Sequence, residues 1–284
     1  MRMLNDDEAY HVVSRVAFRK FVFDDEGKRK FIDVLRRQAA FSGVELLSFC
    51  VMSNHFHLLI RFRSQVLPES DAELIARYRR LYPRNEWISE RTLSPDRLES
   101  ILNEGGSEAV IARKRLCARM GSLAIFMKEL KQRFTIWYNK NHDNVGTLWE
   151  STFRSQLIEN SAKVLRMVAA YIELNPVRAG IVEHAEDYRW SSLGRAKMGD
   201  PQFKQILRTL WGIVDETFGF LNADQDWKVH RDLRLIRAGC LGSAEFVRRL
   251  CEKLLPHRKN KFRPVPWSGD TDVEMFTLRK IKRP

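Results

Sequence analysis

The sequence predicts a fold of the α+β class built on an antiparallel sheet. Residues 44–52 and 55–62 are short runs rich in apolar side chains, and only Ser53 and Asn54 separate them. A two-residue connection between such runs is typical of a β-hairpin, whose strands pair antiparallel. A third run at 10–15 precedes a helical pattern, so the chain begins strand, helix, strand, strand.

The helices are predicted from their apolar spacing and from their ends. Acidic residues at 24–26 suit the start of a helix, because the helix dipole favours negative charge there. The clearest helix covers 119–140, where apolar residues recur at three- and four-residue steps. The helix that begins at residue 161 stops at Asn175-Pro176, since proline cannot continue a helix. In chain order we expect a strand at 10–15, a helix at 24–41, strands at 44–52 and 55–62, a helix at 119–140, a strand or hairpin within 145–159 and a helix at 161–174. The order β-α-β-β-α-β-α is that of a ferredoxin-like (RRM-like) sheet with one additional helix.

Two segments fall outside this pattern. We interpret residues 64–117 as an insertion that is helical in parts, with a short helix at 71–81. Beyond residue 192 we expect α-helices followed by a basic, proline-punctuated tail. The helices of this C-terminal region are predicted at 202–218, 226–236 and 243–255. The domain prediction is therefore 1–192, with the insertion, and 193–284 as a helical C-terminal region with a basic tail.

The composition indicates the kind of partner. The formal net charge is +13 at pH 7, and a strongly basic balance favours a polyanion, most often nucleic acid. The alternative is a basic surface without a function. The four cysteines are scattered without a CxxC pair, which argues against a zinc ribbon or a disulfide framework. No run approaches the roughly 20 apolar residues of a membrane helix, so we expect a cytoplasmic protein with no membrane partner.

Two histidines mark the first half of a candidate site. His55 and His57 flank Phe56 in a predicted strand, so their side chains leave the same face of the sheet. Two neighbouring imidazoles are suitable ligands for a metal ion. A histidine pair on a strand is more often structural, however, and the pattern needs a further ligand.

The helix at 161–174 supplies the second half. Leu165, Val168 and Ile172 form its apolar face, while Tyr171 and Asn175 lie four residues apart on a neighbouring face. A tyrosine and an amide are therefore expected close together at the end of this helix. Taken alone, the tyrosine would be a structural residue and Asn175-Pro176 a helix stop.

Together these motifs resemble a known family. The histidine pair, followed by the segment 171–180 (YIELNPVRAG), resembles the HUH single-tyrosine transposases. Within that class the sequence is most similar to the REP-associated tyrosine transposases, which have an IS200-like transposase domain. The stretches 137–139 (WYN) and 146–149 (GTLW) also resemble that family. The resemblance covers about residues 8–63 and 118–192; the insertion and the C-terminal region depart from minimal family members.

The resemblance implies an enzyme that cleaves and rejoins single-stranded DNA, an endonuclease and transposase acting in DNA recombination. His55, His57 and Asn175 would bind Mg²⁺ or Mn²⁺, and Tyr171 would attack the scissile phosphate to form a 5′-phosphotyrosine. The DNA would carry hairpin-forming repeats, and monomer and homodimer both stay open. Candidate phosphate contacts, each weighed against a plain surface charge, are Arg15, Arg61, Arg154 and Arg178.

Two other functions fit parts of the pattern. A nucleotide hydrolase of the histidine-triad type also places alternating histidines on a strand, but it needs a third histidine where this chain has Leu59. A non-catalytic nucleic-acid-binding protein, derived from a transposase, would keep the ferredoxin-like sheet. The aromatic pair that such sheets use for stacking is not evident in the strands.

Overall fold

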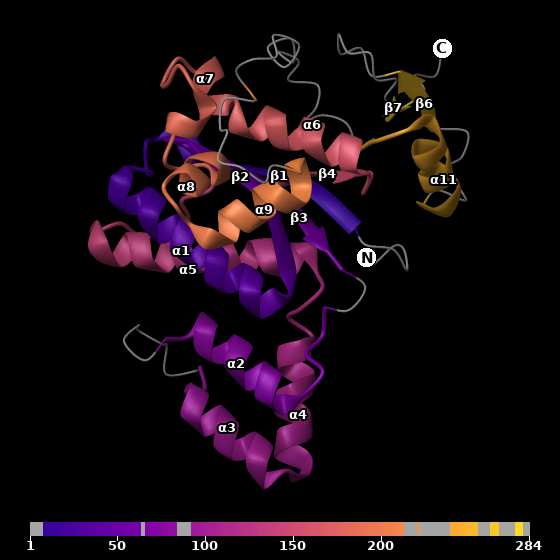
Figure 1. The fold of residues 1–284 in the computed structure, drawn as a ribbon. Helices are drawn as coiled ribbons and strands as arrows, with labels where there is room; N and C mark the ends of the chain where they lie inside the picture. Colours follow the sequence, from indigo (N-terminus) through magenta and orange to yellow (C-terminus); the bar gives the residue numbers. More distant parts are fainter. Residues whose placement is uncertain are drawn as a thin grey trace. The chain divides into compact units, whose positions relative to one another are not determined.

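In the computed structural model, five strands form one mostly antiparallel sheet in the order β2-β3-β1-β4-β5 (Figure 1). The hairpin between β2 and β3 turns at Ser53 and Asn54, where the Met52 amide donates to the His55 carbonyl at 2.8 Å. The order of the first four strands is that of a ferredoxin-like sheet, which confirms the predicted fold class. The strands are β1 (Glu8–Arg15), β2 (Val44–Val51), β3 (His55–Phe62), β4 (Arg154–Ile158) and β5 (Cys240–Leu241).

The structure describes residues 8–63, 66–83, 92–212, 221, 239–254, 262–266 and 276–280. They divide into two compact units. The first unit contains Arg29–Glu45 and Phe62–Thr147, and the second contains Met3–Lys28, Leu46–Arg61 and Leu148–Pro284. The predicted domain boundary at residue 192 stays a prediction. Within the described ranges, no helix is long and apolar enough to cross a membrane.

The first unit is helical and includes the predicted insertion. Ser70 and Ser94 cap two of its helices, by accepting from the backbone amides of Glu73 and Arg97. Gly105 and Gly106 both have positive φ (75° and 72°) and turn the chain sharply between two others. The helix predicted at 71–81 is confirmed. The helices of this unit are most of α1 (Asp25–Ser42), then α2 (Asp71–Leu81), α3 (Pro95–Glu104), α4 (Gly106–Cys117) and α5 (Leu123–Asn141).

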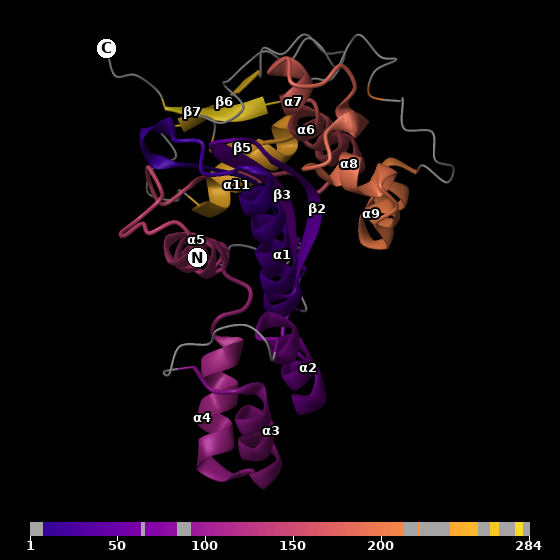
Figure 2. The ribbon, with the colours of Figure 1, turned by 90° about the vertical axis from the view of Figure 1, so that its left-hand side faces the viewer.

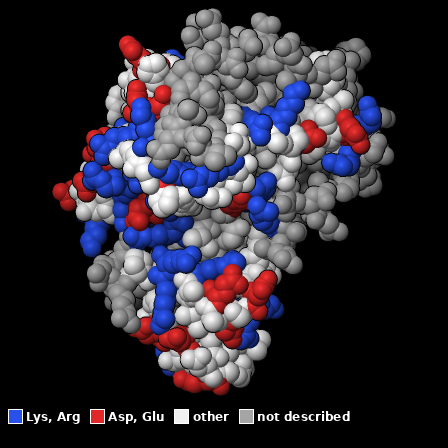
Figure 3. All heavy atoms as spheres, viewed as in Figure 1, with Lys and Arg blue, Asp and Glu red and all other residues white. Residues whose placement is uncertain are grey.

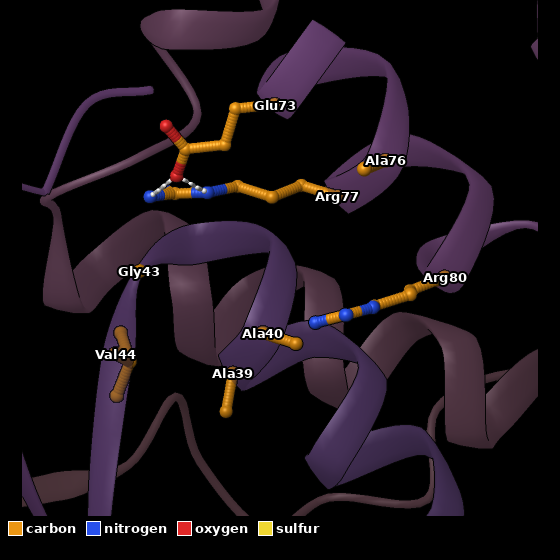
Figure 4. A pocket seen from close by; sticks show the side chains of 8 residues that line it. All are labelled: Ala39, Ala40, Gly43, Val44, Glu73, Ala76, Arg77 and Arg80. Carbon is orange, nitrogen blue, oxygen red and sulfur yellow. Dashed lines mark hydrogen bonds and ion pairs between the residues drawn. The ribbon is translucent and has the colours of Figure 1, made fainter. Parts of the chain in front are cut away.

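A pocket of the first unit lies between the end of α1 and α2 (Figure 4). Arg77 reaches into it, but its guanidinium binds the Glu73 carboxylate at 2.5 Å and the Val66 carbonyl at 2.7 Å. The arginine charge is thus compensated within the pocket, and the arrangement is structural. The lining residues are Ala39, Ala40, Gly43, Val44, Glu73, Ala76, Arg77 and Arg80.

The second unit holds the sheet and the helix that contains Tyr171. This helix, α6, lies alongside the sheet (Figures 1 and 2), and its predicted apolar face is buried, with Leu165 4%, Val168 0% and Ile172 0% exposed. The chain bends after α6 and continues as a short helix. Helices of this unit are η1 (Ala17–Arg19), α6 (Ala162–Glu173), α7 (Asn175–Arg178), η2 (Ala185–Asp187), α8 (Ser192–Lys197), α9 (Pro201–Trp211) and α11 (Ala244–Leu254).

The C-terminal region contains strands that were not predicted, in addition to the expected helices. β5 pairs parallel with β4, and β6 (Phe262–Pro266) pairs antiparallel with β7 (Phe276–Lys280). β5 is only two residues long and shows no alternation in sequence. The two prolines of β6 argue against a strand when that segment is considered alone. The helix at 243–255 is confirmed as α11 and that at 202–218 in part as α9, whereas the one at 226–236 lies outside the described residues.

A buried carboxylate fixes α6 against the rest of the second unit. Glu173 is 2% exposed and accepts hydrogen bonds from Ser48 Oγ at 2.8 Å on β2, from the Leu193 amide at 3.1 Å on α8, and from Ser192 Oγ. Burial raises the pKa of the Glu173 carboxyl, while these hydrogen bonds from Ser192, Ser48 and Leu193 oppose the shift. Because buried donors lose free energy when their acceptor is removed, this group determines where the end of α6 lies.

We therefore expect Glu173→Ala to lower the free energy of unfolding by roughly 2–5 kcal/mol, since three buried donors lose their acceptor. Urea denaturation followed by circular dichroism measures the change. Glu173→Gln should cost less because one acceptor oxygen stays, and the exposed Glu183→Ala should leave stability nearly unchanged. Equal stability of the Glu173→Ala and Glu183→Ala variants would show that the carboxylate does not hold α6.

Candidate active site

The fold brings Tyr171 of α6 beside two histidines of the sheet. The Tyr171 ring lies 6.0 Å from the ring of His57 on β3, centroid to centroid, in an edge-on arrangement. It lies 5.8 Å from the ring of His11 on β1, also edge-on. All three side chains are buried, at 6%, 2% and 1% exposed for Tyr171, His57 and His11. The two halves of the predicted site therefore meet in one place.

His55 and His57 lie side by side on β3, as their alternation predicts. Their ring centroids are 5.2 Å apart. His55 Nδ1 is 2.8 Å from Asn54 Oδ1, and Asn54 Nδ2 donates to the Arg19 carbonyl at 3.2 Å, which orients the amide. Because an amide oxygen only accepts, Nδ1 of His55 bears the hydrogen and Nε2 keeps the lone pair that a metal needs.

His11 is a member of this cluster that sequence reasoning missed. Its Nε2 lies 3.1 Å from His57 Nδ1, and the two rings stack at 5.4 Å and 16°. When His57 Nδ1 donates in this hydrogen bond, His57 Nε2 keeps its lone pair, so His11 orients the ring for ligation. The available signal was weak: a lone histidine at the second position of a predicted strand.

Burial keeps these histidines neutral. It lowers the pKa of His11 to about 4. It lowers that of His55 to about 4 as well, with a smaller contribution from the Arg15 cation. The pKa of His57 lies well below its usual value, through burial first and then through its neighbours His11 and His55 and the cations Arg178 and Arg15. Neutral imidazole is the form that binds a metal.

Tyr171 and Arg178 form the second half of the site. The Arg178 guanidinium carbon lies 4.3 Å from the centroid of the Tyr171 ring, and Nη2 donates to the Tyr171 carbonyl. Nη1 of Arg178 is buried without a hydrogen-bond partner among the described residues. Burial raises the pKa of the Tyr171 phenol, and the Arg178 cation opposes that shift. An unsatisfied cationic donor beside a phenol suits an anionic oxygen.

Asn175 lies at the bend between α6 and α7. Its Nδ2 donates to the carbonyls of Tyr171 at 3.0 Å and Ile172 at 3.1 Å, which leaves Oδ1 as the atom that could bind a metal. These contacts hold the amide nitrogen of Asn175 against the end of α6. Its role as a third ligand stays a prediction.

The donor set determines which metal would fit. In the part of the chain that the structure describes, no three His, Cys, Asp or Glu side chains converge to hold an ion. Two neutral imidazoles therefore need further oxygen ligands, such as an amide, water or phosphate. Open positions of this kind suit a divalent ion that also contacts its substrate.

The other predicted arginines share one face of the sheet with the histidines. Arg61 follows His55 and His57 at even spacing on β3, and its Nη1 donates to Asn160 Oδ1 at 3.1 Å. Arg15 lies four residues after His11 on β1, so the two side chains leave the same face of the strand.

Arg154 on β4 is opposite Val13 on β1. Val13 is two residues from His11, so it lies on the same face of the strand. The Arg154 side chain is exposed. Residues opposite one another in antiparallel strands share a face. All three arginines are thus on the face that carries the histidines.

Comparison with known proteins finds a family match for the first part of the chain. Residues 6–86 match the model of a family described as "Transposase IS200 like". The matched segment contains β1, β2 and β3, and ends before α6. The relationship predicted from the sequence motifs is confirmed for that segment.

A search of curated proteins found no match. A solved structure described as "Structure of the REP associates tyrosine transposase bound to a REP hairpin" matches with 16% sequence identity and a TM-score of 0.40. The match covers 69% of this chain and 81% of that one.

The depressed histidine pKa values predict a pH-dependent stability. A histidine with a pKa of about 4 when folded and about 6.5 when unfolded is protonated first in the unfolded state. Stability should therefore fall as the pH is lowered from about 6.5 to about 4, by up to about 1.4 kcal/mol per pH unit for each such group. Urea denaturation in EDTA between pH 7 and pH 4.5 measures this slope.

The variant His11→Gln should reduce the slope, because it removes one of the buried titrating groups. His184, whose side chain is exposed, supplies the matched control His184→Gln. If both variants keep the wild-type slope, His11 does not titrate in this window and its burial as a neutral group is wrong.

Proposed function

From the match of residues 6–86 to the model of the IS200-like transposases, together with the arrangement around Tyr171, we propose that this chain cleaves and rejoins single-stranded DNA through Tyr171. The observation that carries the proposal is the contact of the Tyr171 ring with the histidine cluster on one side and with Arg178 on the other. A nucleophile, a pair of neutral imidazoles and an unsatisfied cationic donor thus meet in one buried place. These are the groups that a phosphoryl transfer needs.

The proposed step is an exchange of one phosphodiester for another. The Tyr171 Oη attacks the phosphorus of the scissile phosphate, loses its proton and forms a P–O bond. The bond between phosphorus and the 3′-oxygen breaks, and that oxygen leaves as a free 3′-hydroxyl after taking up a proton. The 5′-phosphotyrosine conserves the bond energy, so a 3′-hydroxyl that returns can rejoin the strand without ATP.

The phenol needs help to attack at neutral pH. A free tyrosine has a pKa of about 10, and burial raises that of Tyr171 further. The Arg178 cation over the ring favours the phenolate. A bound Mg²⁺ or Mn²⁺, held by His55 Nε2 and His57 Nε2 with Asn175 Oδ1 as a candidate third ligand, would supply Lewis-acid polarisation of the phosphate.

Arg178 is the residue best placed to hold the reacting phosphate. Its Nη1 is buried without a hydrogen-bond partner among the described residues, while Nη2 is held by the Tyr171 carbonyl. A non-bridging phosphate oxygen would satisfy Nη1 and bring its charge beside the phenol. Arg15, Arg61 and Arg154, on the same sheet face, would contact phosphates along the strand.

The charge of the chain supports a nucleic-acid substrate. Lys and Arg side chains are spread over much of the face shown in Figure 3, in keeping with the net charge of +13. The solved structure described above is a transposase bound to a REP hairpin, and we propose a hairpin-containing single strand as the substrate here as well. Duplex DNA should be a poor substrate, because its scissile phosphate cannot enter a buried site without strand separation.

Covalent trapping tests the proposal. Incubation with labelled single-stranded hairpin DNA and Mn²⁺ should yield a protein–DNA adduct that survives denaturing electrophoresis. Tyr171→Phe should form no adduct, because it lacks the attacking oxygen, while Tyr138→Phe in α5 should form it as the wild type does. An adduct with Tyr171→Phe would refute the mechanism. Binding without an adduct on any hairpin, with Mg²⁺ or Mn²⁺, would favour a non-catalytic DNA-binding protein.

A further inference from the structure

The connection between β1 and α1 exposes two phenylalanines. Phe18 is 92% exposed and Phe21 79% exposed, which makes them the most exposed aromatic side chains in the described part of the chain. By contrast Phe23, two residues later, is 1% exposed. Exposure of two large aromatic side chains in one short loop is costly in water and indicates a binding surface.

The backbone of this loop is strained and held in place. Phe18 and Arg19 have φ values of 53° and 54°, in the left-handed region that bulky residues rarely adopt. Strain of this kind persists where the surrounding structure fixes it, and it is concentrated at functional sites.

Four hydrogen bonds provide that fixation. The Val16 amide donates to the Asn54 carbonyl at 2.8 Å, and the Ala17 amide to the Leu148 carbonyl at 2.8 Å. The Phe23 amide donates to the Ser53 carbonyl at 3.0 Å, and Asn54 Nδ2 to the Arg19 carbonyl at 3.2 Å. The loop is thus anchored to the β2–β3 turn at both of its ends.

The same anchors place the loop next to the candidate active site. Asn54 joins the two directly, because its Nδ2 binds Arg19 in the loop and its Oδ1 binds His55 Nδ1. Arg15, at the end of β1, is close enough for its cation to lower the pKa of His55. A strand whose phosphate lies at Tyr171 would therefore have neighbouring nucleotides near this loop.

The side chains of the loop indicate which kind of partner it binds. Arg19 and Lys20, between the two phenylalanines, are both exposed. Exposed aromatic rings interleaved with cations bind unpaired bases by stacking and the phosphates by charge. A duplex offers no free base face, and a protein partner would not require the two cations.

We propose that Phe18 and Phe21 stack on unpaired bases of a single DNA strand beside the scissile phosphate, with Arg19 and Lys20 contacting its backbone. This assignment rests on the proposed function for the position of the strand. The surface Phe18-Arg19-Lys20-Phe21, here called the base-stacking loop, adds to the preference for unpaired DNA that the buried site already imposes.

Binding measurements test the loop. Fluorescence anisotropy with a labelled single-stranded oligonucleotide should show about a tenfold weaker Kd for Phe18→Ala and again for Phe21→Ala. Phe18→Tyr should bind like the wild type, since tyrosine stacks equally. Met198→Ala, at a side chain that is 59% exposed elsewhere in the same unit, should also bind normally.

Salt dependence and base removal separate stacking from charge. The phenylalanine variants should keep the wild-type slope of log Kd against log salt concentration, whereas Arg19→Ala should reduce it by about one. A strand with abasic positions offers no bases for stacking. The wild type and the Phe18→Ala/Phe21→Ala double variant should therefore bind that strand equally weakly.

The proposal is overturned if the double variant binds the intact strand within twofold of the wild type. It is overturned as well if the two phenylalanine substitutions weaken binding of the abasic strand as much as they weaken binding of the intact strand. It is also overturned if sedimentation velocity shows that the double variant changes oligomeric state, since the loop would then be a protein interface. Covalent trapping distinguishes the two claims. Stacking without an adduct overturns only the proposed function, and an adduct without a phenylalanine effect overturns only the base-stacking loop.

Discussion

The hydrogen bonds to the buried Glu173 carboxylate are the constraint on which the site depends. They join the end of α6 to β2 and to the start of α8. Two residues earlier on the same helix, Tyr171 contacts the histidines of β1 and β3. Without a fixed end of α6, the nucleophile would have no defined position over the sheet, and a misplacement of about 1 Å costs on the order of a hundredfold in rate.

Burial has opposite consequences for the two halves of the site. It keeps His11, His55 and His57 neutral, as a metal site requires, but it also raises the pKa of the Tyr171 phenol and so opposes attack. The resting site is therefore organised but not activated. In the proposed mechanism, a divalent ion held by His55 and His57 would polarise the phosphate. A phosphate oxygen would accept a hydrogen bond from Nη1 of Arg178, which has no partner among the described residues.

The sequence was most informative where local pattern and final structure coincide. Alternation placed His55 and His57 on one face of β3, and a two-residue step predicted the hairpin before them. Helical spacing predicted the buried face of α6. These features depend on residues close together in the chain. The spacing of apolar residues, every 2 in a strand and every 3.6 in a helix, therefore predicts them.

Features that depend on distant parts of the chain were missed. His11 contacts His57 only after β1 enters the sheet next to β3, and nothing within residues 10–15 distinguishes it from a structural histidine. β5 is two residues long and exists only as a partner of β4. The exposure of Phe18 and Phe21 likewise could not be predicted from the sequence of their loop, since exposure is a property of the folded unit.

The central claim is that Tyr171 forms the bond to DNA, and peptide mapping tests it most directly. Trypsin cleavage after Arg166 and Arg178 releases the peptide MVAAYIELNPVR, in which Tyr171 is the sole hydroxyl-bearing side chain. After trapping with single-stranded DNA and nuclease digestion, tandem mass spectrometry should find a 5′-nucleotide phosphate on Tyr171 of this peptide. The same mass on a peptide containing any other tyrosine, with this one unmodified, would contradict the account.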